Sequence, residues 1–137
     1  MKYSHVVLDG LSYALPPDTL TSEELEARLE PLYRRLKLPA GRLELMTGIR
    51  ERRFWPAGVQ PSEAAARAGK AALESAGVDP SEIDLLIHTG VCRDRLEPAT
   101  AAYAHGILGL SESVQILDIS NACLGFLNGM TLAGGMI

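Results

Sequence analysis

Apolar and polar positions along the chain fall into segments with the spacing of strands and helices. The apolar run from His5 to Gly10 predicts a short strand, and the proline-rich residues 16–18 predict a loop after it. Thr21 and Glu24 have the spacing of a capping box, in which each side chain accepts a hydrogen bond from the other residue's backbone N–H. A helix is therefore expected after Thr21. Its leucines recur at helical spacing, and they are Leu25, Leu29, Leu32 and Leu36.

Further helix signals follow this leucine pattern. Pro31 is expected to kink or divide the leucine helix, and residues 43–46 are expected to form one helical turn. Ser62 predicts the N-cap of another helix, which Gly77 should end. That helix has almost no bulky side chain except Leu73, so its packed face should lie close to a neighbouring surface.

The second half of the chain has the pattern of a βαβ unit. An apolar strand is expected over residues 83–90, then a helix begun by Pro98 and running to about Leu108, then a second apolar strand over residues 114–119. A right-handed crossover would make the two strands parallel in a buried sheet covered by helices. The predicted fold class is α/β, and the length of 137 residues favours one folding unit.

Charge and cysteine content narrow the classes of function. A formal net charge of −4 gives no overall electrostatic reason for binding nucleic acid, which needs a basic surface. No apolar run approaches membrane-spanning length, and the N-terminal residues lack the pattern of a signal peptide. Cys92 and Cys123 are far apart, which suits reduced thiols better than a disulfide framework or a zinc site. These features predict a cytoplasmic protein without a metal, a nucleic-acid partner or a membrane span.

Cys123 stands at the predicted junction between the second strand and an apolar, helix-compatible segment. A thiol there lies near the free N–H groups and the positive end of the helix dipole, which favour the nucleophilic thiolate. Backbone N–H groups at the same junction could hold the oxyanion formed when a thioester carbonyl is attacked. The alternative is a buried small apolar residue, because free Cys is among the most buried residue types.

Two motifs resemble one known family. Residues 118–126, Asp-Ile-Ser-Asn-Ala-Cys-Leu-Gly-Phe, resemble the nucleophile elbow of 3-oxoacyl-(acyl-carrier-protein) synthase III and its relatives in the thiolase superfamily. Residues 47–53, Thr-Gly-Ile-Arg-Glu-Arg-Arg, resemble a second signature of this family. The resemblance implies the N-terminal half of a thiolase-like fold, a parallel-rich sheet with helices on its faces. That domain would span residues 1–137 and be truncated within the helix after the nucleophile.

The same resemblance implies a chemistry for Cys123. Cys123 would accept an acyl group from a coenzyme A or carrier-protein thioester. Coenzyme A would enter only as part of the substrate, with no permanently bound cofactor. The family also uses a His and an Asn from its C-terminal half, supplied by the same gene product or by another chain. The 137 residues alone are therefore expected to be inactive.

Residues 93–100, Arg-Asp-Arg-Leu-Glu-Pro-Ala-Thr, look most like the bacterial enzymes that join two fatty acyl-CoAs head to head in olefin biosynthesis. In those enzymes the Glu that matches Glu97 projects from one subunit of a homodimer into its partner's active site, where it is proposed as the base for the Claisen condensation. The resemblance thus implies a homodimer and a catalytic Glu97, acting in its own or the partner's site. Glu97 also has a structural interpretation, as a first-turn acid that complements the helix begun by Pro98.

Several assignments stay open. One alternative function is a synthase III that uses a malonyl donor, and another is a non-catalytic fragment that packs against a partner chain. The arginines at 50, 52 and 53 could bind coenzyme A phosphates or be surface charges. Family contacts near Arg42 and Met46 are not carried over, because these residues depart from the family pattern. Cys92 is expected in the core, and no catalytic role is assigned to His5, His88 or His105.

Overall fold

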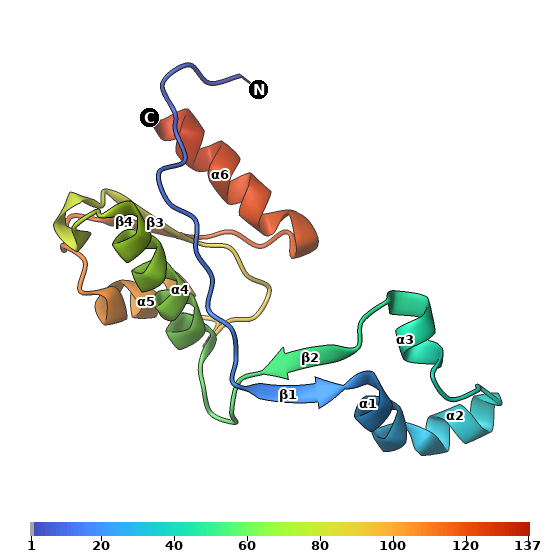
Figure 1. Ribbon diagram of the computed structural model, residues 1–137. Coiled ribbons are helices and arrows are strands. Elements are labelled where there is room, and N and C mark those ends of the chain that lie inside the picture. The colour runs from blue at the N-terminus through green and yellow to red at the C-terminus, as the bar shows by residue number, and fades with distance from the viewer. Residues whose placement is uncertain (1) are drawn as a thin grey trace. The chain divides into compact units, whose positions relative to one another are not determined.

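Two parallel strands, β3 (Leu85–His88) and β4 (Gln115–Asp118), form the sheet of the larger of two compact units. The helix that connects them is α5 (Thr100–Leu108), so the predicted βαβ unit is confirmed (Figure 1). The register pairs Leu85 with Gln115 and His88 with Asp118. Because the strands are parallel, the loops that follow them both begin at the same edge of the sheet.

The computed structural model describes residues 2–137. The larger unit combines the N-terminal residues up to Ala14 with Val59–Ile137, and the smaller unit is Leu15–Gly58. The length alone favoured one folding unit, whereas the contacts within the chain divide it into these two.

Helix α4 (Pro61–Ala76) packs closely against α5, as its lack of bulky side chains predicted. Alanines make this contact possible, since Ala66 in α4 and Ala101 and Ala104 in α5 are buried. The helix ends at Gly77, whose φ of +68° lies in the left-handed region that favours glycine. It begins earlier than predicted, with Gln60 rather than Ser62 at the N-cap.

Two short 3-10 turns, η1 (Pro80–Glu82) and η2 (Ala122–Leu124), and helix α6 (Gly125–Met136) complete the larger unit. Helix α6 contacts β3. A Cβ atom added at Gly129 would lie only 2.7 Å from Cγ2 of Thr89, so a glycine is needed for this approach.

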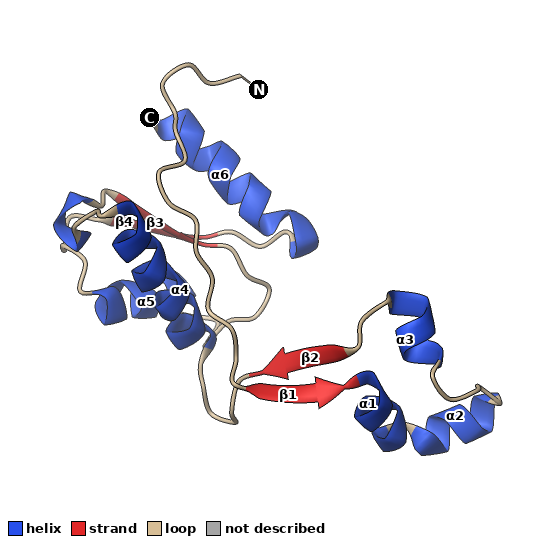
Figure 2. Cartoon of the chain, viewed as in Figure 1, coloured by secondary structure: helices blue, strands red, loops and turns tan. Residues whose placement is uncertain are grey.

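The predicted strand from His5 to Gly10 is wrong. These residues are irregular in the structure, as the loop colouring of the N-terminal segment shows (Figure 2). The segment crosses α4 instead of pairing with a strand, and a Cβ at Gly10 would lie 2.9 Å from the carbonyl oxygen of Ala72. An apolar run does not show that a strand edge is available to pair with it, and Val7 and Leu8 of this run are exposed.

The smaller unit has an antiparallel pair, β1 (Asp18–Thr21) and β2 (Glu51–Phe54), and three short helices, α1 (Ser22–Arg28), α2 (Glu30–Leu36) and α3 (Arg42–Thr47). The capping box is confirmed, because Glu24 N–H donates to Thr21 Oγ1 at 3.1 Å and Thr21 N–H donates to Glu24 Oε2 at 2.8 Å. The leucine helix is divided at Leu29, next to Pro31 as predicted.

None of the helices formed by residues 2–137 combines the length and the apolar character needed to cross a bilayer.

Candidate active site

Cys123 lies in η2, the turn that joins β4 to α6, so its predicted place at a strand-to-helix junction is confirmed. Its side chain is exposed in this chain rather than buried among apolar residues. The strand pairing extends just past β4, since Ile119 N–H donates to the carbonyl oxygen of His88 at 2.9 Å. The thiol therefore projects from a turn that begins at the carboxyl edge of the parallel sheet.

The backbone of this turn is unusual directly before the cysteine. Ala122 has a φ of +41°, in the left-handed region that residues with a Cβ rarely adopt. Asn121 closes the turn on both sides: its carbonyl oxygen accepts from Leu124 N–H at 2.8 Å, and its Nδ2 donates to Asn128 Oδ1 in α6 at 2.6 Å. Asn128 was not predicted from the sequence, although it is the one Asn in an apolar helix.

Small residues bring the cysteine turn against the end of β3. A Cβ at Gly125, the first residue of α6, would lie 3.3 Å from the carbonyl oxygen of Thr89. Thr89 also begins the loop that leads to Glu97. The segments that carry Cys123 and Glu97 thus leave neighbouring strands at the same edge of the sheet (Figure 1).

Glu97 is exposed in the loop between β3 and α5 and is joined to Pro98 by a cis peptide bond. The prediction that Pro98 begins the helix is wrong, because α5 starts at Thr100 with Ala99 at its N-cap. The reason is the Asp118 carboxylate, which accepts the N–H groups of Thr100 at 2.8 Å and Ala101 at 2.9 Å. Asp118 therefore supplies the negative charge at the start of α5, and Glu97 lies outside its first turn.

A second carboxylate holds the loop that carries Glu97. Asp94 Oδ1 accepts from Ser62 N–H at 2.9 Å, and Asp94 Oδ2 accepts from the Ser62 hydroxyl. The Asp94 N–H in turn donates to Thr100 Oγ1 at 3.4 Å. From the sequence, Ser62 was predicted only as a helix N-cap, and Asp94 and Asp118 had no predicted contacts, because Asp94–Ser62 and Asp118–Thr100 join residues far apart in the chain.

The other candidate groups form no second centre. Cys92 is exposed, which corrects its expected place in the core, because it lies in the loop after β3 rather than within the strand. His88 Nδ1 lies 3.7 Å from Asp118 Oδ1, and His105 Nε2 lies 2.9 Å from the carbonyl oxygen of Ser111. Within residues 2–137, the structure brings together no set of three or more His, Cys, Asp and Glu side chains suited to a metal.

The arginines of the second motif belong to the smaller unit and have partners there. Arg52 donates to the Ser22 hydroxyl at 2.9 Å, and the guanidinium of Arg53 lies 3.9 Å from Glu51. Arg50 lies 3.8 Å from Glu44. Binding of coenzyme A phosphate by this cluster stays a prediction.

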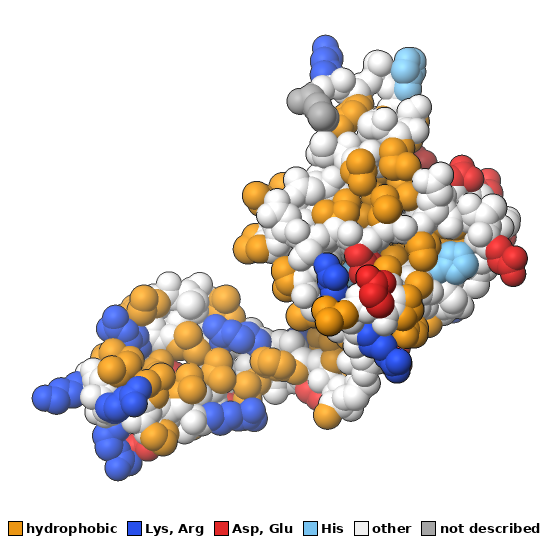
Figure 3. All heavy atoms as spheres, turned by 180° about the vertical axis from the view of Figure 1, so that it is seen from behind, with side chains coloured by type: hydrophobic (Ala, Val, Ile, Leu, Met, Phe, Trp, Pro, Cys, Tyr) orange, Lys and Arg blue, Asp and Glu red, His pale blue; other side chains and the backbone are white. Residues whose placement is uncertain are grey.

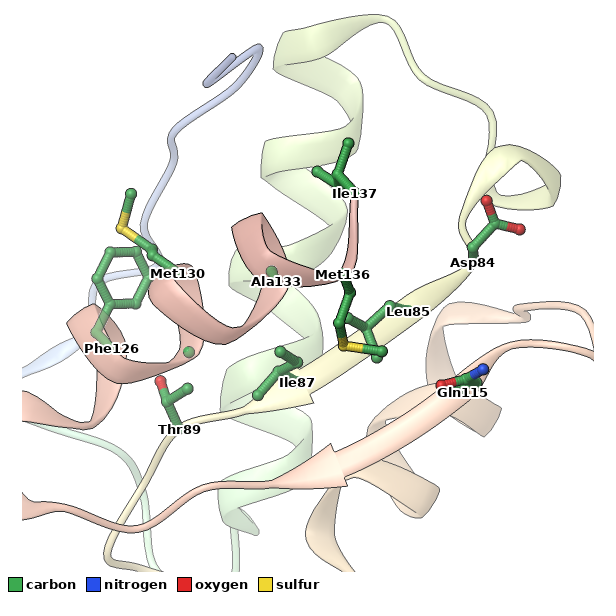
Figure 4. A pocket seen from close by; sticks show the side chains of 11 residues that line it. Asp84, Leu85, Ile87, Thr89, Gln115, Phe126, Met130, Ala133, Met136 and Ile137 are labelled. Carbon is green, nitrogen blue, oxygen red and sulfur yellow. The ribbon is translucent and has the colours of Figure 1, made fainter. Parts of the chain in front are cut away.

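A pocket of about 740 Å³ lies between the sheet and α6 (Figure 4). Its side chains are mostly apolar and include Leu85 and Ile87 of β3 and Phe126, Met130 and Met136 of α6. Neither Cys123 nor Glu97 lines it. The pocket is therefore separate from the candidate catalytic groups.

Comparison with curated proteins shows close relatives. The chain is 48% identical over 130 residues to an acyl-CoA:acyl-CoA alkyltransferase of Shewanella oneidensis and 43% identical over 137 residues to one of Xanthomonas campestris. It is 36% identical over 133 residues to a beta-ketoacyl-(acyl-carrier-protein) synthase III of Symbiobacterium thermophilum. These matches cover 95%, 100% and 97% of this chain but only 37%, 40% and 38% of the relatives. No protein-family profile matches the chain.

Solved structures of similar proteins have the same fold over nearly the whole of this chain. Cerulenin-bound OleA of Xanthomonas campestris matches with a TM-score of 0.93 at 43% identity, over 98% of this chain and 39% of that one. A 3-oxoacyl-(acyl carrier protein) synthase III of Xanthomonas oryzae pv. oryzae matches with a TM-score of 0.93 at 43% identity, over 99% of this chain and 40% of that one. The predicted resemblance and the thiolase-like α/β fold are confirmed, and the chain spans about two fifths of the length of the relatives it matches.

Proposed function

Since this chain is a thiolase-like relative of the acyl-CoA:acyl-CoA alkyltransferases, we propose that it is the part of an acyl-CoA condensing enzyme that carries the acyl-accepting Cys123. The observation that carries the proposal is the exposed thiol in a strained strand-to-helix turn, at the sheet edge where the Glu97 loop also begins. By the complete enzyme we mean this chain together with the remaining length found in its relatives.

The proposed reaction has two steps. The Cys123 thiolate attacks the thioester carbonyl of a fatty acyl-CoA, the coenzyme A thiolate leaves, and an acyl-cysteine thioester remains. Glu97, in its own site or in the partner subunit's site of a homodimer, then removes the α-proton of a second acyl-CoA. The resulting carbanion attacks the acyl-cysteine carbonyl and expels the Cys123 thiolate, which leaves a 3-oxoacyl-CoA. Coenzyme A takes part only as a portion of these substrates and products.

Variants of a relative support this choice of residues. OleA of Xanthomonas campestris has been solved with a Glu changed to Gln or Asp and with a Cys changed to Ala. Those Glu and Cys positions are separated by the same number of residues as Glu97 and Cys123. The structure of the same protein has also been solved with a His changed to Asn or Asp. More residues separate that His from the Cys of the relative than follow Cys123 in this chain. This fits a His supplied by the remainder of the complete enzyme.

Acylation of Cys123 can be tested by intact-mass measurement of the complete enzyme after incubation with a long-chain acyl-CoA. We expect one acyl adduct that is lost in Cys123→Ala. Cys92→Ala is the matched control, because it removes the other exposed thiol of this chain and should leave the adduct in place. An adduct that persists in Cys123→Ala, or no adduct on the unaltered enzyme, contradicts the acyl-accepting role, and the second result favours a non-catalytic packing module.

The role of Glu97 is tested separately by Glu97→Gln. Removing a general base typically costs about 10²- to 10⁴-fold in rate, so condensation of two acyl-CoAs should fall by that factor while Cys123 acylation is retained. Unchanged condensation would remove Glu97 from the mechanism. If the enzyme accepts a malonyl donor but not a second acyl-CoA, the synthase III alternative is favoured instead.

A further inference from the structure

We propose that Asp94 is a positioning residue that holds the Glu97 loop in the geometry needed for α-proton removal. This inference rests on the proposed function of Glu97. Asp94 lies three residues before Glu97 and ties the loop to α4, so the loop cannot move freely at that point.

The hydrogen bonds between Asp94 and α4 are partly buried. Ser62 is only 2% exposed, and the Asp94 carboxylate accepts both its N–H and its hydroxyl. Arg93 and Arg95, on either side of Asp94, are exposed. Of these three charged side chains, only that of Asp94 is directed into the molecule. Loss of the carboxylate would leave two buried donors of Ser62 without this acceptor, which is costly for the folded loop.

A second tie fixes the other end of the loop. Thr100 is fully buried, its hydroxyl accepts the Asp94 N–H at 3.4 Å, and its own N–H donates to Asp118 at 2.8 Å. Asp118 belongs to β4, the strand that leads to the cysteine turn. The loop that carries Glu97 is thus anchored to α4 at one end and to the cysteine-bearing strand at the other.

The two reaction steps depend differently on this anchoring. For proton removal, an oxygen of the Glu97 carboxylate must lie within about 2.6–3.2 Å of the α-carbon that bears the proton, or of a bridging water. Displacement of a catalytic group by about 1 Å can cost about 10²-fold in rate. Acylation of Cys123 makes no use of Glu97, so a loosened loop should slow condensation but spare acylation.

The test compares condensation with Cys123 acylation in the complete enzyme. Asp94→Ala should lower the ratio of the condensation rate to the acylation rate by about 10- to 100-fold. Asp94→Asn should restore most of this ratio, because its amide oxygen still accepts from Ser62 N–H and its amide NH₂ donates to the Ser62 hydroxyl. Ser62→Ala removes one of the two bonds and should give a smaller loss in the same direction. It decides the question if Asp94→Ala does not fold.

Asp79 provides a matched control, because its carboxylate makes the same pair of bonds to a serine. It accepts Ser81 N–H at 2.9 Å and the Ser81 hydroxyl at 2.6 Å, at the turn η1. Asp79→Ala should leave the ratio unchanged. A parallel loss of both steps in Asp94→Ala, or no loss in a folded variant, overturns the positioning role while the proposed function stands. If Glu97→Gln itself leaves condensation unchanged, the proposed function and this inference fail together.

Discussion

Ala122, directly before the candidate nucleophile, has a backbone conformation that its side chain disfavours. A residue with a Cβ pays about 1–2 kcal/mol to adopt the left-handed region, and a β-branched residue is a stronger outlier there. The φ of +41° is thus maintained by the surrounding turn, including the contact between Asn121 and Asn128. Such strained turns are typical of nucleophiles placed between a strand and a helix.

This conformation can be tested by two substitutions at Ala122. Ala122→Val should lower the free energy of unfolding of the complete enzyme by about 1–2 kcal/mol and slow acylation, because valine resists a positive φ. Ala122→Gly is the control, since glycine adopts this region readily and should retain acylation. Urea unfolding and the rate of adduct formation measure the two effects. If valine and glycine behave alike, the left-handed conformation has no role in presenting the thiol.

Motifs in the sequence selected Cys123 and Glu97, but not the residues that hold them in place. The hydrogen bonds of Asp94 to Ser62 join residues 32 positions apart, and those of Asp118 to the start of α5 span up to 18. No local pattern links such pairs, since their contact depends on how α4, α5 and the sheet pack. Asp118 stood inside a recognised motif, yet its partners became visible only in the structure.

At the scale of elements, several helix boundaries that depend on residues close together in the sequence were predicted correctly. The capping box before α1, the division of the leucine helix at Leu29 and the stop at Gly77 all follow from residues a few positions apart. The strands β1 and β2 were not predicted, because residues such as Arg52 and Arg53 carry no apolar alternation. Their pairing joins Asp18 to Phe54 and is fixed by contacts across the smaller unit.

Glu26 links the three helices of the smaller unit, although it is a buried acid. Its carboxylate accepts from Leu43 N–H at 2.5 Å, from Gly41 N–H at 2.6 Å and from the Tyr33 hydroxyl at 3.0 Å. The hydrogen bond from Leu43 N–H is the main cause that lowers the pKa of Glu26, and those from Gly41 and Tyr33 act in the same direction. Burial and the contact with Glu26 raise the pKa of Tyr33.

A pH dependence of stability follows. Because the pKa of Glu26 is lower in the folded state than in the unfolded chain, its carboxylate stabilises the smaller unit above the unfolded value of about 4.3. That contribution is lost as the pH falls through the folded value. Glu26→Gln should therefore increase hydrogen exchange of residues 15–58 at pH 7, and the difference from the unaltered protein should shrink toward pH 3. Glu23→Gln, on an exposed neighbour, is the control. A difference that grows on acidification would contradict the assigned role.

At the scale of the whole molecule, the surface of α6 is the feature that the proposed function must account for. The helix contains no Asp, Glu, Lys or Arg, and Phe126 and Leu127 are 55% and 58% exposed. Apolar side chains are also grouped on other parts of the surface of each unit (Figure 3). Exposed apolar patches mark surfaces that contact another protein surface. The chain covers about two fifths of its relatives, so we expect the remaining part of the complete enzyme to cover α6.

One substitution distinguishes a covered helix from an exposed one. In the 137-residue chain, Leu127→Asp should leave the unfolding midpoint nearly unchanged and reduce binding of a dye specific for apolar surface, because Leu127 is already half in water. In the complete enzyme the same change would bury an unpaired carboxylate, which is strongly destabilising, and the midpoint should fall. The complete enzyme without the substitution should bind less dye per residue than the 137-residue chain. Equal effects of Leu127→Asp in the two proteins would mean that α6 faces water in both, and the proposed covering by the rest of the enzyme would be wrong.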